Sequence, residues 1–310
     1  MRRAFLVIAL LLIIPTLLFS QRRNRYKWEF VGSIGFDDLF SDLGGSPQVG
    51  SHGLIGVKDW NLDATRPCFS AGVRYKNSKH FAFKSSLAFA WLYADDALSQ
   101  NPIRNNRNLN VRTPVVELSA QVEYFPLKEK QSRLYRVKRA VGKRKAITQL
   151  QPYFFAGIGA FWFNPQGRDP GLNGAWVDLR PLHTEGEGLP GGPKQYSTFA
   201  VSAPLGIGFK YPINRQLSVG MEISIHLTTS DYIDDASGKY YDPNLFKLNE
   251  SPSLAPQSIR LADPSLDHNL GGNSAPGQER ANPSSKDAIM YTMFNLNYKI
   301  YTKRRTRTKF

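Results

Sequence analysis

The sequence predicts an all-β fold: an eight-stranded antiparallel transmembrane β-barrel with long outer loops and short periplasmic turns. Three observations support this prediction. Apolar and polar side chains alternate over long stretches, eight such stretches occur, and the connections between them differ systematically in length. Because successive side chains of a strand point to opposite faces, each stretch has one apolar face. A strand that crosses a bilayer at a tilt needs ~9–11 residues, and outer-membrane barrels begin at eight strands.

The clearest strand covers residues 81–93, where Phe81, Phe83, Phe89 and Trp91 share one face and small or polar residues occupy the other. The remaining seven strands are predicted over 26–36, 68–76, 116–124, 151–163, 199–211, 217–228 and 293–300. Residues 151–163 are apolar on both faces, so their orientation stays open. Pro204 has no backbone N–H to donate to a neighbouring strand, and we expect a bulge or break there.

The connections between these strands alternate in length. Residues 37–66, 94–113, 164–197 and 231–286 form long connections, whereas 77–79 and 212–216 form tight turns. Long outer loops and short periplasmic turns are typical of outer-membrane barrels, and the connection 126–150 is the exception. Residues 231–286 are rich in Pro, Ser, Asn and Gly, which predicts a long mobile outer loop.

The first 20 residues have the composition of a secretory signal peptide: two arginines precede an apolar run, and a small residue ends it. The alternative is an N-terminal anchor helix, for which the apolar run is short. Residues 21–301 then form the barrel, with 302–310 as a basic tail and both termini in the periplasm. The single cysteine, Cys68, excludes an internal disulfide and zinc sites built on paired cysteines.

Charge is divided between the two sides of this predicted topology. The periplasmic segments 21–27, 76–80, 126–149, 211–216 and 299–310 contain 22 basic residues and one acidic residue, whereas acidic residues outnumber basic ones in the long connections. This basic side has three interpretations: an edge facing anionic lipid, a docking surface for an acidic periplasmic partner, or a nucleic-acid site. The signal peptide argues against the nucleic-acid site, because it predicts that the protein is exported. The candidate docking residues are Lys128, Lys130, Arg133, Arg136, Lys138, Arg139, Lys143, Arg144, Lys145, Arg304, Arg305 and Arg307.

Charged residues also fall on the predicted inner face of the strands. Four are acidic and four are basic, so we expect a paired network, because an unpaired buried charge is costly. Side chains fill the interior of an eight-stranded barrel, which argues against a pore. The predicted interior residues are Glu29, Arg74, Lys84, Glu117, Glu123, Lys210, Glu222 and Lys299.

Two groups of residues raise other chemistry. Glu222, Ser224 and His226 share one inward row and are the residue types of a catalytic triad, but side chains two apart on a strand lie ~7 Å apart. They could bond only with help from another strand, so we expect no enzyme. Acidic residues near DYIDDASGKYYD, namely Asp231, Asp234, Asp235 and Asp242, could bind calcium, although the spacing does not fit an EF-hand. We expect no cofactor and no metal.

Two stretches, WEFVGSIGFDDLFSDLGGS and LQPYFFAGIGAFWFNPQG, resemble the corresponding regions of PorG-type outer-membrane proteins. The resemblance implies a component of the type IX secretion machinery that contacts outer-membrane lipid. It also implies association with a periplasmic ring made of a lipoprotein and its partner subunit, with no catalytic residues. The alternative is a small adhesion or envelope-anchoring barrel whose outer loops bind surface ligands.

Overall fold

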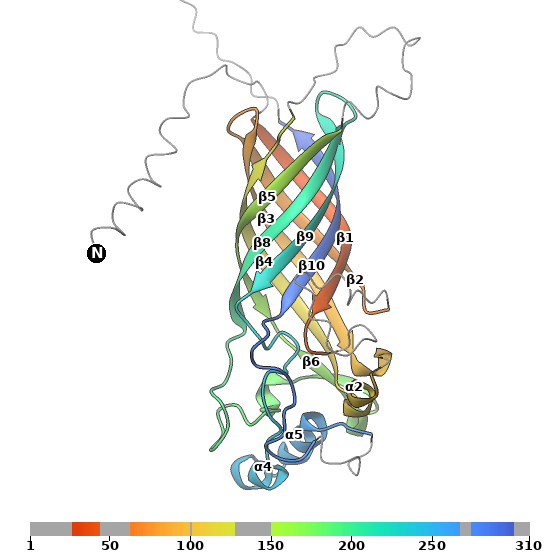
Figure 1. The fold of residues 1–310 in the computed structure, drawn as a ribbon, viewed down its shortest axis with the longest axis vertical. Helices are drawn as coiled ribbons and strands as arrows, with labels where there is room; N and C mark the ends of the chain where they lie inside the picture. Colours follow the sequence, from red (N-terminus) through yellow and green to blue (C-terminus); the bar gives the residue numbers. More distant parts are fainter. Residues whose placement is uncertain (1–26, 44–62, 100, 128–149, 267–273, 301–310) are drawn as a thin grey trace, which may run out of the picture.

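The computed structural model describes residues 27–43, 63–99, 101–127, 150–266 and 274–300. Eight long strands pair antiparallel in sequence order, and the first pairs with the last, so the sheet closes into a barrel (Figure 1). The predicted eight-stranded antiparallel barrel is therefore confirmed. Its strands are β1 (Trp28–Phe40), β2 (Arg66–Lys76), β3 (Phe81–Asp95), β4 (Asn110–Tyr124), β5 (Gln151–Phe163), β8 (Phe199–Pro212), β9 (Leu217–Thr228) and β10 (Ala288–Lys299).

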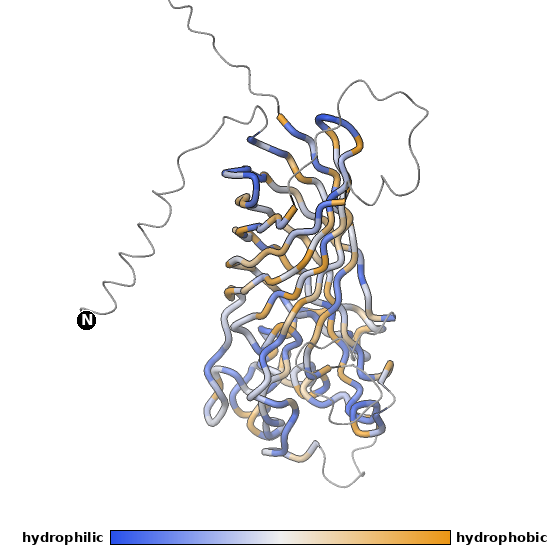
Figure 2. Tube along the Cα trace, turned by 45° about the horizontal axis from the view of Figure 1, so that its top comes forward, coloured by the Kyte–Doolittle hydropathy of each residue, from blue (hydrophilic) through white to orange (hydrophobic). Residues whose placement is uncertain are grey.

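The barrel wall carries its large apolar side chains on the outside. Every barrel strand contributes exposed Phe, Leu, Ile, Val, Trp or Tyr residues, among them Phe30, Phe83 and Phe294. Figure 2 shows apolar and polar residues alternating along the strands. An apolar outer face around a polar interior is the arrangement of barrels that span outer membranes, and this barrel is of that kind. None of the helices in the described ranges has the length and apolarity to cross a membrane.

The orientation of β5, which the sequence left open, is defined by the burial of its side chains. Tyr153, Phe155, Phe161 and Phe163 are buried in the interior, while Phe154, Ile158 and Trp162 face outward. Glycine on the neighbouring strand makes room for one of these rings, because a Cβ at Gly208 would lie 2.3 Å from the Tyr153 ring. The interior is thus lined by aromatic as well as charged residues.

Of the bulge or break expected at Pro204, the structure has a break, in one of the two ladders of the strand. The pairing of β8 with β9 continues past it, with Pro204 opposite His226. On the other side, β8 and β5 pair in one register before and after the proline, and only the positions around it are skipped. The strand therefore tolerates the missing N–H as a local gap in one ladder.

The long connections fold over one end of the barrel (Figure 1). We call their described residues, 41–43, 63–65, 96–99, 101–109, 164–198, 229–266 and 274–287, the cap. Segment 231–286, for which composition predicted mobility, instead contains two helices and buried side chains. The elements of the cap are η3 (Asp96–Leu98), α2 (Pro102–Arg107), β6 (Gln166–Asp169), η5 (Pro170–Leu172), β7 (Ala175–Asp178), η6 (Arg180–Leu182), α4 (Pro243–Asn249) and α5 (Ala255–Ala262).

The cap has an apolar core of its own that continues into the barrel. Leu43, Leu109, Leu179 and Leu261, from four separate connections, belong to one buried cluster. Ile233 enters the barrel mouth, where it packs in a second buried cluster and its carbonyl accepts a hydrogen bond from Thr113 Oγ1 at 2.7 Å. The cap and the barrel interior are therefore packed together at the mouth.

Candidate functional site

The structure places all eight predicted interior charges inside the barrel, each at most 6% exposed. Arg74 on β2 lies at the centre of the main group. Its guanidinium forms ion pairs with Glu123 at 2.6 Å, Glu29 at 3.2 Å and Glu222 at 3.4 Å. It also donates a hydrogen bond to Asn297 Oδ1 at 2.6 Å. One cation thus bridges carboxylates from three other strands.

Lysines complete this network. Lys84 pairs with Glu222 at 2.6 Å, and Lys210 pairs with Glu29 at 2.5 Å. Lys76 also pairs with Glu29, at 3.0 Å. Sequence reasoning left Lys76 on the periplasmic side, although its position two residues after Arg74 places it on the same inward face.

Aromatic rings and apolar side chains fill the space around the charges. Arg74 lies over the Tyr153 ring at 5.5 Å, and Lys84 lies over the Phe155 ring at 5.2 Å. Toward the cap, a buried apolar cluster that includes Leu92 and Phe161 occupies the interior. An interior packed in this way is suited to support the wall rather than to conduct solutes.

A second interior group joins β4, β8 and β9. His226 Nδ1 lies 2.8 Å from Glu117 Oε1, and His226 Nε2 lies 3.1 Å from Ser224 Oγ. The expectation from strand geometry that Ser224 and His226 would be too far apart is therefore wrong, since their side chains lie within hydrogen-bonding distance. The carboxylate comes from Glu117 on another strand, while Glu222 belongs to the Arg74 network.

This serine–histidine–glutamate row is tightly enclosed. All three side chains are buried, and Ser202 Oγ donates a further hydrogen bond to Glu117 at 2.5 Å. Even a Cβ at Gly159 would lie 2.6 Å from the Glu117 carboxylate. A substrate needs space beside the serine, and the packing here instead favours a structural bond between three strands.

The end of the barrel opposite the cap carries the short turns 77–80 and 213–216 (Figure 1). The chain enters β1 and leaves β10 at this end, where Ile300 N donates to Trp28 O at 2.9 Å. Lys79 and Arg215 are exposed on the two turns. The candidate docking residues from Lys128 to Lys145 and from Arg304 to Arg307 lie outside the described residues.

Buried ion pairs connect the segments of the cap. Arg280 pairs with Glu185 at 3.1 Å, and Arg107 pairs with Asp96 at 2.7 Å. Arg280 Nη1 also donates to the carbonyl oxygen of Asp235 at 2.5 Å. The Arg280–Glu185 pair joins two different connections, whereas the Arg107–Asp96 pair lies within the connection between β3 and β4.

Several carboxyl groups of the cap are buried close to one another. Burial raises the pKa of Glu187 to about 8, and the nearby charges of Asp235 and Glu185 add to the increase. Burial also raises the pKa of Asp235 to about 6, against the opposing effect of Arg280. The pKa of Asp234 is raised by burial to about 8. The cap therefore retains protons that solvent-exposed carboxyl groups would release.

The acidic residues considered for calcium binding have separate partners. Asp231 accepts a hydrogen bond from Ser237 Oγ at 2.5 Å, whereas Asp235 accepts one from Tyr196 Oη at 2.6 Å. Asp242 caps α4 by accepting from Asn244 N at 2.8 Å. Within the described ranges, no group of three or more His, Cys, Asp or Glu residues has the arrangement of a metal site.

No family model and no curated protein matches this chain. Among solved structures, it is similar to Ail, the attachment invasion locus protein of Yersinia pestis in complex with a heparin analogue, with 9% identity and a TM-score of 0.35 over 88% of this chain and 99% of that one. Neisserial surface protein A has 8% identity and a TM-score of 0.34 over 88% and 97% of the two chains. The N-terminal barrel domain of Pseudomonas aeruginosa OprF has 8% identity and a TM-score of 0.34 over 89% and 98%.

Proposed function

We propose that this chain is a non-enzymatic outer-membrane barrel that serves as an anchor in a protein secretion machine of the type IX kind. The observation that carries the proposal is the filled interior: the Arg74 network and the rings packed on it occupy the barrel near its short-turn end. A barrel without a conducting interior acts through its two ends. The function then depends on what each end binds.

The short-turn end is suited to an acidic partner. We propose that it faces the periplasm, where Lys79 and Arg215 are exposed and where the chain continues into the basic segments 128–145 and 303–309. Complementary charge steers association and selects against partners of the wrong sign. The resemblance to PorG-type proteins makes the proposed partner a periplasmic ring composed of a lipoprotein and a second subunit.

The test reverses charge at this end and compares it with reversal at the other. Arg136→Glu, Arg139→Glu and Arg144→Glu together should abolish co-purification of the periplasmic ring from detergent-solubilised membranes, while the barrel still inserts. The matched control reverses three exposed cap lysines, Lys194, Lys239 and Lys247, and should leave co-purification unchanged. Equal recovery of the ring with both triple variants would refute the docking role.

A second candidate function is adhesion through the cap. The observation that favours it is that the cap has its own buried core and ion pairs, which hold exposed side chains in fixed positions. Leu248 and Leu266 are large apolar residues exposed on this surface. Leu248→Lys combined with Leu266→Lys should reduce attachment of cells to protein-coated surfaces without reducing secretion, and unchanged attachment would exclude adhesion through this part of the surface.

A further inference from the structure

The cap contains a cavity of about 290 Å³ between α2, the connection 274–282 and the end of β1. Its wall includes Asn101, Ile103 and Arg104 from α2 and its flank, together with Tyr240 and Glu279. Small-molecule sites usually occupy ~300–1,000 Å³, so this cavity is suited to one small ring rather than an extended chain. It lies at the opposite end of the barrel from the proposed docking surface.

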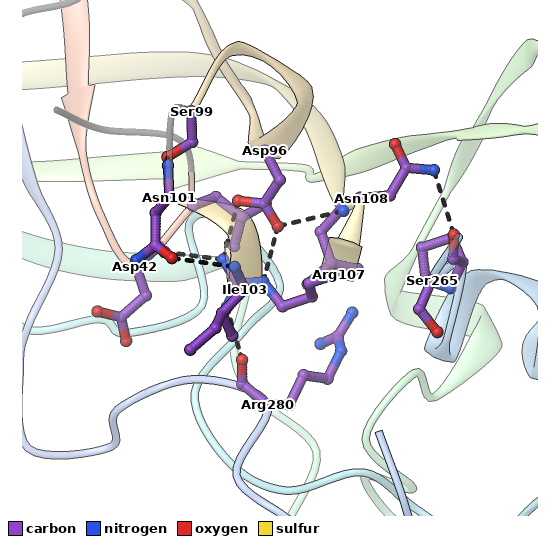
Figure 3. Close-up of polar contacts among 12 residues, drawn as sticks. Asp42, Asp96, Ser99, Asn101, Ile103, Arg107, Asn108, Ser265 and Arg280 are labelled. Atoms are coloured by element: carbon purple, nitrogen blue, oxygen red, sulfur yellow. Dashed lines mark hydrogen bonds and ion pairs between the residues drawn. The ribbon is translucent and has the colours of Figure 1, made fainter. Parts of the chain in front are cut away.

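The cavity is built on a fixed framework (Figure 3). Arg107 donates to both carboxylate oxygens of Asp96, at 2.7 and 2.9 Å. The same guanidinium donates to the carbonyl oxygens of Arg280 at 2.6 Å and Asp42 at 2.9 Å. Asp42 in turn accepts a hydrogen bond from Asn282 N at 2.6 Å. Three connections are therefore locked around the cavity before any ligand binds, which lowers the entropy cost of binding.

Charged groups of both signs line the cavity. Arg107 and Arg280 on its wall are paired with the buried carboxylates Asp96 and Glu185. The wall also contains carboxylates of its own, from Asp42 and Glu279, close to Arg104. An anionic ligand would meet these carboxylates and a cationic ligand the guanidinium groups, so the lining favours an uncharged ligand.

The polar groups of the wall combine donors with acceptors. The guanidinium of Arg104 donates and the carboxylate of Glu279 accepts, while the carboxamide of Asn101 accepts from Ile103 N through Oδ1 and can donate through Nδ2. The Tyr240 ring and the Ile103 side chain add apolar surface. A sugar ring presents the matching chemistry, since its hydroxyls donate and accept while its C–H faces are apolar. We propose that this cavity binds a single neutral saccharide unit.

The test measures binding of neutral sugars to the purified full-length barrel in detergent micelles by calorimetry. The probes are glucose, galactose, mannose, N-acetylglucosamine, rhamnose and fucose. At least one should bind with a Kd of about 1 mM or tighter, as expected for a small ligand with few contacts. Galacturonate and glucosamine serve as anionic and cationic counterparts.

Two variants locate the site. Ile103 is 60% exposed, so Ile103→Trp should fold normally while it fills the cavity, and it should weaken binding at least tenfold. Glu279→Gln removes an acceptor from the wall and should also weaken binding. The matched control is Leu248→Trp, at a position 77% exposed on α4 and away from the cavity wall, and it should bind as the native chain does.

Three results would overturn the proposal. They are the absence of binding by all six neutral sugars, tighter binding of a charged counterpart, and equal loss of binding in Ile103→Trp and Leu248→Trp. None of them bears on co-purification of the periplasmic ring, so the proposed docking role stands or fails separately.

Discussion

In the barrel interior, each carboxylate of the Arg74 network lies beside a cation, whereas in the cap several carboxylates lie beside one another. Glu29, Glu123 and Glu222 pair at 2.5–2.6 Å with Lys210, Arg74 and Lys84, respectively. In the cap, burial and neighbouring acidic groups raise the pKa values of Glu187 and Asp234 to about 8. The comparison indicates that cations neutralise the buried carboxylates of the interior, and it predicts that the stability of the cap depends on pH.

The largest loss of stability should follow removal of Arg74, the central cation of the barrel interior. Arg74→Met would leave Glu29, Glu123 and Glu222 without the guanidinium that bridges them. Breaking a buried pair from one side costs about 3–5 kcal/mol, and the cost should fall mainly on Glu123, whose ion pair with Lys84 is long, at 3.8 Å. Urea unfolding in detergent micelles should show a loss of this size, and the double variant Arg74→Met with Glu123→Gln should recover part of it. A loss below about 1 kcal/mol would show that Lys76, Lys84 and Lys210 alone neutralise the buried carboxylates.

Removal of Arg280, the main buried cation of the cap, should destabilise the cap and leave the barrel unchanged. Arg280→Met takes away the partner of Glu185 and the donor to the Asp235 and Ala262 carbonyls. Hydrogen bonds to charged groups contribute about 1.5–3 kcal/mol, so protease cleavage within the cap should become roughly 10–100 times faster. The barrel itself should keep its unfolding midpoint. Lys239→Met, at an exposed cap position, is the control and should change neither quantity.

The cap should lose stability as pH rises. Its folded state holds Asp235, Glu187 and Asp234 at pKa values of about 6, 8 and 8, above the ordinary range near 4 of an opened segment. The stabilisation is thus fully present below about pH 4 and is lost as pH rises through 6 to 8, at about 1.4 kcal/mol per unit for each group.

Hydrogen exchange followed by mass spectrometry, corrected for intrinsic rates, measures this pH dependence segment by segment. Protection of the cap amides around 184–187 and 233–237 should fall between pH 5 and pH 9. Glu187→Gln should flatten the profile, because it removes one of the titrating groups. An equally steep profile in Glu187→Gln would assign the pH dependence to other groups.

Strand periodicity predicted much of the barrel because each inward charge is fixed by its own strand. Arg74 and Lys84 could be assigned to the interior from alternation alone. Alternation failed for β5, where Tyr153 and Phe155 face inward but their neighbours are equally apolar. It also could not supply the partner of His226, since Glu117 is brought to it by the curvature and closure of the barrel.

The cap was missed for a related reason. For residues 231–286, a composition rich in Pro, Ser, Asn and Gly predicted a mobile loop, and the segment lacks the period of a helix or strand. Order there comes from residues that bridge separate connections. Arg107 joins Asp96, Asp42 and Arg280, and no local pattern signals such contacts. The cavity between these connections was equally invisible in the sequence.

The smallest loss of stability should come from breaking an ion pair at the surface of the cap. Arg260 pairs with Asp169 at 3.1 Å, but the arginine side chain is 41% exposed. Asp169 keeps hydrogen bonds from Gln257 Nε2 at 2.9 Å and Gly171 N at 2.8 Å. Arg260→Met should therefore cost less than about 1 kcal/mol, as exposed pairs do. The measurement is the cap cleavage rate used for Arg280→Met, which should change less than about fivefold. If Arg260→Met and Arg280→Met accelerated cleavage equally, an exposed ion pair would stabilise the cap as much as a buried one. Burial would then no longer explain why the barrel interior and the cap differ.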